Sequence, residues 1–167
     1  MPNAAIFTCK PIGQFVRRYL DESTVSIDPF AGDFTGATWR NDIRHFTEAD
    51  YHMTAEAFLT DLLHDGITAD LIIFDPPYSK EQAKRSYQLA GMDWCYSDTL
   101  QVGYWSNEKT LCAGLLTPSG IFLHFGWHTN GLGKKRGFEI AEILIVAHGG
   151  AHHDTICMAE CRTTDGM

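Results

Sequence analysis

The stretch LIIFDPPY, residues 71–78, places an uninterrupted apolar run directly before an acidic residue, two prolines and a tyrosine. The apolar run, bounded by Asp70 and Asp75, is typical of a strand covered on both faces, and therefore of the centre of a parallel sheet. Pro76 and Pro77 lack N–H groups and have a fixed φ, so the chain leaves the strand stiffly and presents carbonyl oxygens. We predict a rigid array of hydrogen-bond acceptors at the carboxyl end of a central strand.

Helices and strands alternate on both sides of this stretch. Before it, apolar spacing and turn residues predict helices at 11–20 and 55–64 and strands at 24–27 and 37–40. After it, they predict helices at 80–89 and 106–116 and strands at 120–125, 138–147 and 155–161. Strands that first alternate with helices and then pair as a hairpin indicate an α/β fold with a mostly parallel sheet and an antiparallel edge. Ligands of such sheets bind at the carboxyl ends of the strands, which here are followed by Asp28, Asp42 and Asp75.

The totals favour one domain spanning residues 1–167, without a separate target-recognition domain. With 167 residues and 44% hydrophobic content, the chain is long enough to bury a core. It has no apolar run of bilayer length and no leader pattern, so we expect a cytoplasmic protein without a membrane partner. The five cysteines lack a CxxC pair, which favours reduced thiols. The net charge of -8 argues against binding nucleic acid through bulk electrostatics.

The tetrapeptide at residues 75–78 suits chemistry on an exocyclic amine. The Asp75 carboxylate and the Pro76 carbonyl are two acceptors that can orient the two N–H groups of such an amine. They stabilise the positive charge that the nitrogen gains when it attacks a sulfonium methyl group. Tyr78 offers a flat face on which a base can stack, typically worth ~1 to 3 kcal/mol. The alternative is a Pro-rich turn after a strand, with an ordinary exposed tyrosine.

At these residues the chain resembles the amino-methyltransferases of DNA, which act on N6 of adenine or N4 of cytosine. Asp75-Pro76-Pro77-Tyr78 matches their catalytic motif, and Asp28-Pro29-Phe30-Ala31-Gly32 matches the start of their cofactor motif. Thr8-Cys9-Lys10-Pro11 is similar to their Lys-Pro element, so the motif order is gamma-like, and residues 126–160 resemble the tail of small phage-type members. The resemblance implies a Rossmann-like methyltransferase that uses S-adenosyl-L-methionine.

The same resemblance assigns residues to the cofactor. It implies that Asp28, Phe30 and Ala31 line the methionine and sulfonium part, and that Thr54 and Ala55 lie near the adenine. Asp42 follows the second strand, where a carboxylate binds ribose hydroxyls; the alternative is that it only forms an Asx turn. The resemblance of the Lys-Pro element also assigns Thr8 and Lys10 to the cofactor.

The segment after the first strand departs from this family. Only residues 33–39 separate Gly32 from Arg40, too few for the usual glycine-rich turn and full helix. We therefore expect the first cofactor-side helix to be shortened or absent. Lys10 or backbone N–H groups of residues 32–36 would then face the cofactor carboxylate in place of the helix N-terminus.

Two basic stretches are candidates for gripping a nucleic acid. The first, residues 79–98, mixes cations with Tyr87, Trp94 and Tyr96, and the second, residues 129–137, is a glycine-rich loop. The candidate contacts are Lys80, Lys84, Arg85, Lys134, Lys135 and Arg136. A solvated charged surface is the alternative for both stretches. A base in a duplex would have to leave the helix to reach the catalytic tyrosine.

Histidines gather in the last third of the chain, namely His124, His128, His148, His152 and His153, near Asp154 and Cys157. Their spacing matches no metal-binding pattern, so we predict no metal site.

The sequence therefore predicts a DNA adenine-N6 methyltransferase of the bacterial or phage-infected cytoplasm, as in restriction-modification. Its size favours a homodimer or a partner subunit. Methylation of adenine in RNA, methylation of cytosine N4, and a non-catalytic nucleic-acid-binding subunit of the same fold are the alternatives.

Overall fold

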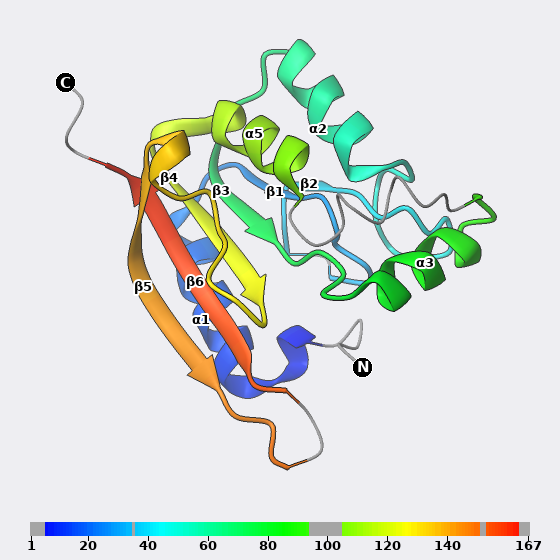
Figure 1. Cartoon of the computed structure of the whole chain (residues 1–167). Coiled ribbons are helices and arrows are strands. Elements are labelled where there is room, and N and C mark those ends of the chain that lie inside the picture. Colours follow the sequence, from blue (N-terminus) through cyan, green and yellow to red (C-terminus); the bar gives the residue numbers. More distant parts are fainter. Residues whose placement is uncertain (1–5, 35, 94–104, 151–152, 164–167) are drawn as a thin grey trace.

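The computed structural model describes residues 6–34, 36–93, 105–150 and 153–163 (Figure 1). Within these ranges the strands form a six-stranded sheet in the order β2-β1-β3-β4-β6-β5. The strands are β1 (Ser26–Asp28), β2 (Trp39–Arg40), β3 (Ala69–Phe74), β4 (Leu116–Gly126), β5 (Phe138–Val146) and β6 (Thr155–Arg162). Pairing is parallel from β2 through β1 and β3 to β4, whereas β6 is antiparallel to both β4 and β5. The predicted mostly parallel α/β sheet with an antiparallel edge hairpin is confirmed.

The stretch LIIF forms the buried centre of this sheet, as predicted. Leu71 and Ile73 pack on one face against helix α1 (Lys10–Glu22), which contributes Ile12 and Phe15. The intervening Ile72 and Phe74 pack on the opposite face, which is covered by α2 (Ala55–His64) and α5 (Ser106–Leu115). All four strand side chains have at most 1% of their surface exposed. Figure 1 shows α1 on one side of the sheet and the pair α2 and α5 on the other.

Two helices begin directly after a residue whose side chain caps them. Thr54 Oγ1 accepts a hydrogen bond of 3.2 Å from the N–H of Ala57 and starts α2 at the predicted residue. Ser79 Oγ accepts one of 3.3 Å from the N–H of Gln82 and starts α3 (Lys80–Leu89). Because α3 follows the tetrapeptide, it lies beyond the carboxyl end of β3 (Figure 1).

The connection from β1 to β2 contains no helix in its described residues 29–34 and 36–38, as the short spacing predicted. A turn replaces it, in which the N–H of Phe34 bonds to the carbonyl of Ala31 at 2.9 Å. Gly32 has a φ of 55°, in the left-handed region that glycine adopts without strain. The N–H of Ala31 bonds to the carbonyl of Asn41 at 2.9 Å, which ties this turn to the segment after β2.

Two further findings concern environment. The described cysteines, Cys9, Cys112, Cys157 and Cys161, are free thiols, and Cys95 lies outside the described residues. None of the helices in the described ranges combines the length and apolarity needed to cross a membrane.

Candidate active site

A cavity of about 330 Å³ opens at the carboxyl ends of β1, β2 and β3. Its wall includes all four residues of the tetrapeptide, Asp75, Pro76, Pro77 and Tyr78. The turn after β1 and the segment after β2 form another part of the wall. The first turn of α2 and one side of α3 also line the cavity. The strand ends that the sequence marked as ligand-binding therefore meet around one cavity.

Asp75 and Tyr78 are joined inside the tetrapeptide. The Tyr78 hydroxyl donates a hydrogen bond of 2.5 Å to Oδ1 of Asp75, and the Tyr78 N–H donates one of 2.7 Å to Oε1 of Gln82. Burial raises the pKa of Asp75 to about 7, although the bond from Tyr78 opposes this shift. Burial and the Asp75 charge raise the pKa of Tyr78, so its phenol stays protonated and acts as the donor. Asp75 is thus a carboxyl group poised to exchange a proton near neutral pH.

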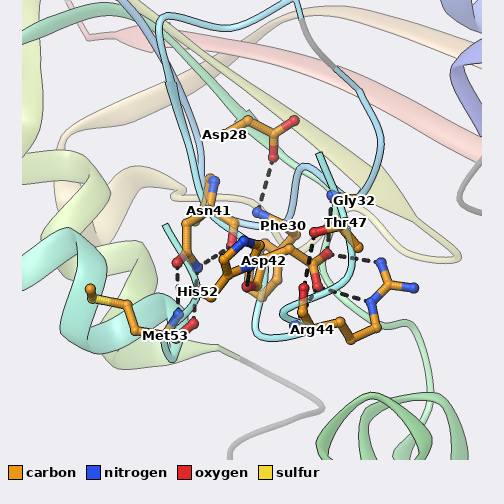
Figure 2. Close-up of polar contacts among 10 residues, drawn as sticks. Asp28, Phe30, Gly32, Asn41, Asp42, Arg44, Thr47, His52 and Met53 are labelled. Carbon is orange, nitrogen blue, oxygen red and sulfur yellow. Dashed lines mark hydrogen bonds and ion pairs between the residues drawn. The ribbon is translucent and has the colours of Figure 1, made fainter. Parts of the chain in front are cut away.

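Asp28 lies behind the cavity wall rather than on it. Its side chain is completely buried, and Oδ1 accepts a hydrogen bond of 3.0 Å from the N–H of Phe30 (Figure 2). Oδ2 has no hydrogen-bond partner among the described residues. Burial raises the pKa of Asp28 well above its usual value, and the charges of Asp75 and Asp42 add to this effect. Asp28 therefore shapes the turn that carries Phe30; it does not line the cavity, and its contact with a cofactor stays a prediction.

Asp42 lies on the wall, and its carboxylate is held by the residue two positions on. The guanidinium of Arg44 donates bonds of 2.9 Å and 2.8 Å to its two oxygens, and the Arg44 N–H donates one of 2.8 Å to Oδ1. The N–H of Gly32 donates a further bond of 3.0 Å to Oδ2, as Figure 2 shows. The Asx turn weighed for Asp42 is therefore present. A ribose hydroxyl could reach this carboxylate only after Arg44 moved aside.

Asn41 holds the cofactor-side loops together, a role that sequence reasoning missed. Its side chain is fully buried, and Nδ2 donates bonds of 3.1 Å to the carbonyl of Pro29 and 3.0 Å to that of Met53. Oδ1 accepts a bond of 3.1 Å from the N–H of Met53 (Figure 2). One amide thus joins the turn after β1 to the segment that leads into α2.

The other residues assigned to the cofactor divide into two groups. Phe30, Ala31, Thr54 and Ala55 line the cavity together with Asp42. The Phe30 ring is held edge-on by Phe74 and Trp105, at centroid distances of 5.3 Å and 5.0 Å.

Thr8 and Lys10 are not on the wall; Thr8 ends the short 3-10 helix η1 (Ile6–Thr8), and Lys10 is exposed at the start of α1. The substitution of Lys10 for the missing helix N-terminus therefore gains no support from the cavity, which is lined instead by the cations Arg44 and Arg85.

The two basic stretches lie at opposite edges of the sheet. Lys80, Lys84 and Arg85 lie on α3 and are exposed, and Arg85 also lines the cavity. The other three cations, Lys134, Lys135 and Arg136, form the 3-10 helix η2 just before β5. Because β5 runs in the direction of β4, its beginning lies at the amino edge, away from the cavity (Figure 1). The structure does not bring the two stretches together.

The second stretch, predicted as a glycine-rich loop, contains the 3-10 helix η2 with defined side-chain contacts. Arg136 donates bonds of 3.0 Å and 2.9 Å to the carbonyl and hydroxyl of Ser106, and one of 3.1 Å to Thr110. Arg136 therefore braces η2 against α5, which explains this cation without a phosphate. In the first stretch, Trp94 and Tyr96 lie outside the described residues.

Among the described residues, the histidines of the last third do not form one cluster, although the rings of His124 and His128 stack with their centroids 5.6 Å apart. His124 is buried in β4, stacks on Phe74 and Phe122, and its burial lowers the pKa to about 3. His148 pairs with the hydroxyl of Thr155 at 2.8 Å. Across the described part of the chain, no group of three or more His, Cys, Asp or Glu is arranged to hold a metal ion, and His152 lies outside it.

No family model and no curated protein matches this sequence. Solved structures do share its fold. One is SMU.776, assigned as a methyltransferase and solved in complex with SAH, with a TM-score of 0.55 and 12% identity over 88% of this chain and 48% of that chain. Another is assigned as a SAM-dependent methyltransferase from Streptococcus mutans, with a TM-score of 0.53, 11% identity and the same coverages of 88% and 48%.

The chain thus has the α/β fold of these methyltransferase structures and spans about half of their length. At such low identity the likeness establishes the fold, and the chemistry rests on the residues of the cavity.

Proposed function

We propose that this protein transfers a methyl group from S-adenosyl-L-methionine to the exocyclic N6 amine of adenine in DNA. One observation carries the proposal: Asp75-Pro76-Pro77-Tyr78 lies on the same cavity wall as five of the residues assigned to the cofactor, namely Phe30, Ala31, Asp42, Thr54 and Ala55. The shared fold with a protein that binds SAH supports it. The tetrapeptide supplies the acceptors for an amine, and the neighbouring strand ends supply the wall for a nucleoside cofactor.

The wall residues fit such a cofactor. A volume of about 330 Å³ lies within the usual range of small-molecule sites. Phe30 and Ala31 supply apolar surface, and Thr54 supplies a hydroxyl at the start of α2. Asp42 would become available to ribose hydroxyls once Arg44, whose side chain is 22% exposed, swung away from it. The cofactor would supply a methyl group that its sulfonium already activates.

Asp75 and Pro76 would act on the amine. The Pro76 carbonyl and the Asp75 carboxylate accept its two N–H groups and turn the nitrogen lone pair toward the methyl group. As the C–N bond forms and the C–S bond breaks, the nitrogen becomes positive, and the two acceptors stabilise that charge. The excess proton then passes from nitrogen to the Asp75 carboxylate and on to solvent. A pKa of about 7 suits Asp75 to both accepting and releasing this proton.

The nucleic acid would be held beside the cavity by α3. Arg85 reaches the wall, and Lys80 and Lys84 are exposed on the same helix. Their charges provide local contacts to phosphate on a chain whose net charge is -8. We propose that Tyr78 stacks on the target base, as aromatic side chains do on unpaired bases.

Labelled S-adenosyl-L-methionine tests this proposal. The protein is incubated with it and with DNA or RNA, and the nucleosides are analysed by mass spectrometry. Label on N6 of adenine in DNA is the expected result. Label only on RNA, or on N4 of cytosine, would favour the alternative substrates, which the tetrapeptide can also orient.

One observation favours a second function, that of a non-catalytic subunit. Arg44 occupies the carboxylate that a cofactor would need. Calorimetry with S-adenosylhomocysteine separates the two functions, because a subunit that has lost cofactor binding will give no heat of binding.

A further inference from the structure

A second aromatic side chain, Trp127, stands beside the tetrapeptide. Strands β3 and β4 are parallel neighbours, with Phe74 opposite His124, so their carboxyl ends lie side by side. The chain leaves β3 toward Tyr78 and leaves β4 toward Trp127. The centroids of these two rings are 5.7 Å apart. The register of the sheet thus places an indole next to the proposed base-stacking tyrosine.

The indole is held in place yet open to solvent. Trp127 is 41% exposed, although indole is among the largest apolar side chains. His153 packs against it from the hairpin that joins β5 and β6, at a centroid distance of 4.7 Å. Contacts with two other rings restrict the orientation of Trp127 before any ligand arrives. A preorganised ring loses little entropy when a flat ligand stacks on it.

The angle between the rings limits what can stack there. Tyr78 and Trp127 are inclined at 71°, so they form a corner rather than a flat platform. Two bases stacked one on each ring would be inclined by a similar angle. Neighbouring bases in a duplex lie parallel and stack on each other, so a duplex step does not fit this corner.

We propose that Tyr78 and Trp127 hold two neighbouring bases of an unpaired strand, the target adenine on Tyr78 and the adjacent base on Trp127. This inference rests on the proposed function and specifies its substrate as a single-stranded or locally unpaired segment. Base stacking on aromatic rings also needs few cations, in keeping with the net charge of -8. Trp127 is then a positioning residue, because it holds the strand and leaves the amine chemistry to Asp75.

Affinity for matched single-stranded and duplex DNA tests this inference. Fluorescence anisotropy with a short labelled strand containing one central adenine, alone or annealed, gives both dissociation constants. We expect the single strand to bind more tightly to the wild type, and Trp127→Ala to weaken single-strand binding by about tenfold. Trp127→Phe should retain most of the affinity. The control Leu63→Ala, at a side chain 42% exposed on α2, should change neither constant.

Unchanged single-strand affinity in Trp127→Ala, or a wild type that prefers the duplex, would overturn the inference. Should Trp127→Ala fail to fold, quenching of tryptophan fluorescence by the single strand decides: it must be smaller in Trp127→Phe than in the wild type, and equal quenching refutes the contact.

Methyl-transfer kinetics keep this inference separate from the proposed function. Trp127→Ala should raise KM for the single strand by about tenfold and leave kcat nearly unchanged. A wild type that transfers methyl groups while Trp127→Ala keeps the wild-type KM refutes only the role of Trp127. A wild type that transfers none, yet binds the single strand through Trp127, refutes only the methyl transfer.

Discussion

The hydroxyl of Tyr78 lies 2.5 Å from Oδ1 of Asp75, so the two side chains of the tetrapeptide act as one hydrogen-bonded unit. The only O–H of Tyr78 is used in this bond, so a base could interact with Tyr78 only through the face of its ring. This bond lowers the pKa of Asp75, against the effect of burial, and so favours the ionised carboxylate near neutral pH. In the proposed reaction, this single contact would couple proton acceptance by Asp75 to base stacking on Tyr78.

The first prediction concerns the pH dependence of methyl transfer. Asp75 accepts a proton only when it is ionised, and its pKa is raised by burial to about 7. We expect kcat to fall as pH drops through about 7 and to reach a plateau above it. A pH profile of kcat with saturating substrates measures this. The profile should extend from about pH 5 to about pH 9, on both sides of that pKa. A flat profile over this range would exclude Asp75 as the proton acceptor.

Tyr78→Phe should shift that profile. The substitution removes the hydrogen bond that lowers the pKa of Asp75 but keeps the ring. The pKa of Asp75 should therefore rise, and the midpoint of the kcat profile should move to higher pH. Tyr78→Ala, the comparison variant, should in addition raise KM for the nucleic acid. An identical midpoint in Tyr78→Phe and wild type would show that the bond has no functional effect.

Arg44 should compete with the cofactor for Asp42. Arg44→Ala frees the carboxylate from its bidentate partner, so S-adenosylhomocysteine should bind about two- to fivefold more tightly, which corresponds to the free energy of a partly exposed ion pair. Asp42→Asn should weaken binding. Arg40→Ala is the matched control, since it removes the pair with Asp50 outside the cavity. Weaker binding by Arg44→Ala in calorimetry would mean that Arg44 itself contacts the cofactor.

Asn41 should matter more for stability than an exposed asparagine. Asn41→Ala leaves the carbonyls of Pro29 and Met53 without a buried donor, so the free energy of unfolding should drop by about 3 kcal/mol. Asn107→Ala removes an exposed bond to Glu56 and should change it by less than about 0.5 kcal/mol. Urea denaturation measures both values. Equal effects of the two substitutions would contradict the bracing role of Asn41.

Much of the fold was predictable because its signals are local. The apolar run before Asp75, the cap at Thr54 and the short spacing after Gly32 each concern a few neighbouring residues, and the structure has the strand, the helix start and the helix-free connection. The strand ends then brought Asp42 and Asp75 to one cavity, as parallel pairing requires.

The remaining features depend on contacts between distant segments. Trp127 meets Tyr78 only through the register of β3 and β4, which no local pattern specifies. Arg136 looked like part of a basic loop, but the direction of β5 places it at the amino edge, bound to Ser106. Asp42 was identified by its position after the second strand. Its partner Arg44 belongs to no recognisable sequence motif, so their ion pair could not be predicted.

The most direct test of the central claim compares the wild type with Asp75→Asn. Both are incubated with S-adenosyl-L-methionine carrying a deuterated methyl group and with adenine-containing single-stranded DNA, and N6-methyladenine is quantified by mass spectrometry. Asparagine keeps an oxygen for the Tyr78 bond but cannot accept the proton. We predict labelled N6-methyladenine from the wild type, at least about a hundredfold less from Asp75→Asn, and equal affinity of both for S-adenosylhomocysteine. No labelled adenine from the wild type, or equal amounts from both proteins, would contradict the assignment of Asp75-Pro76-Pro77-Tyr78 as the catalytic segment.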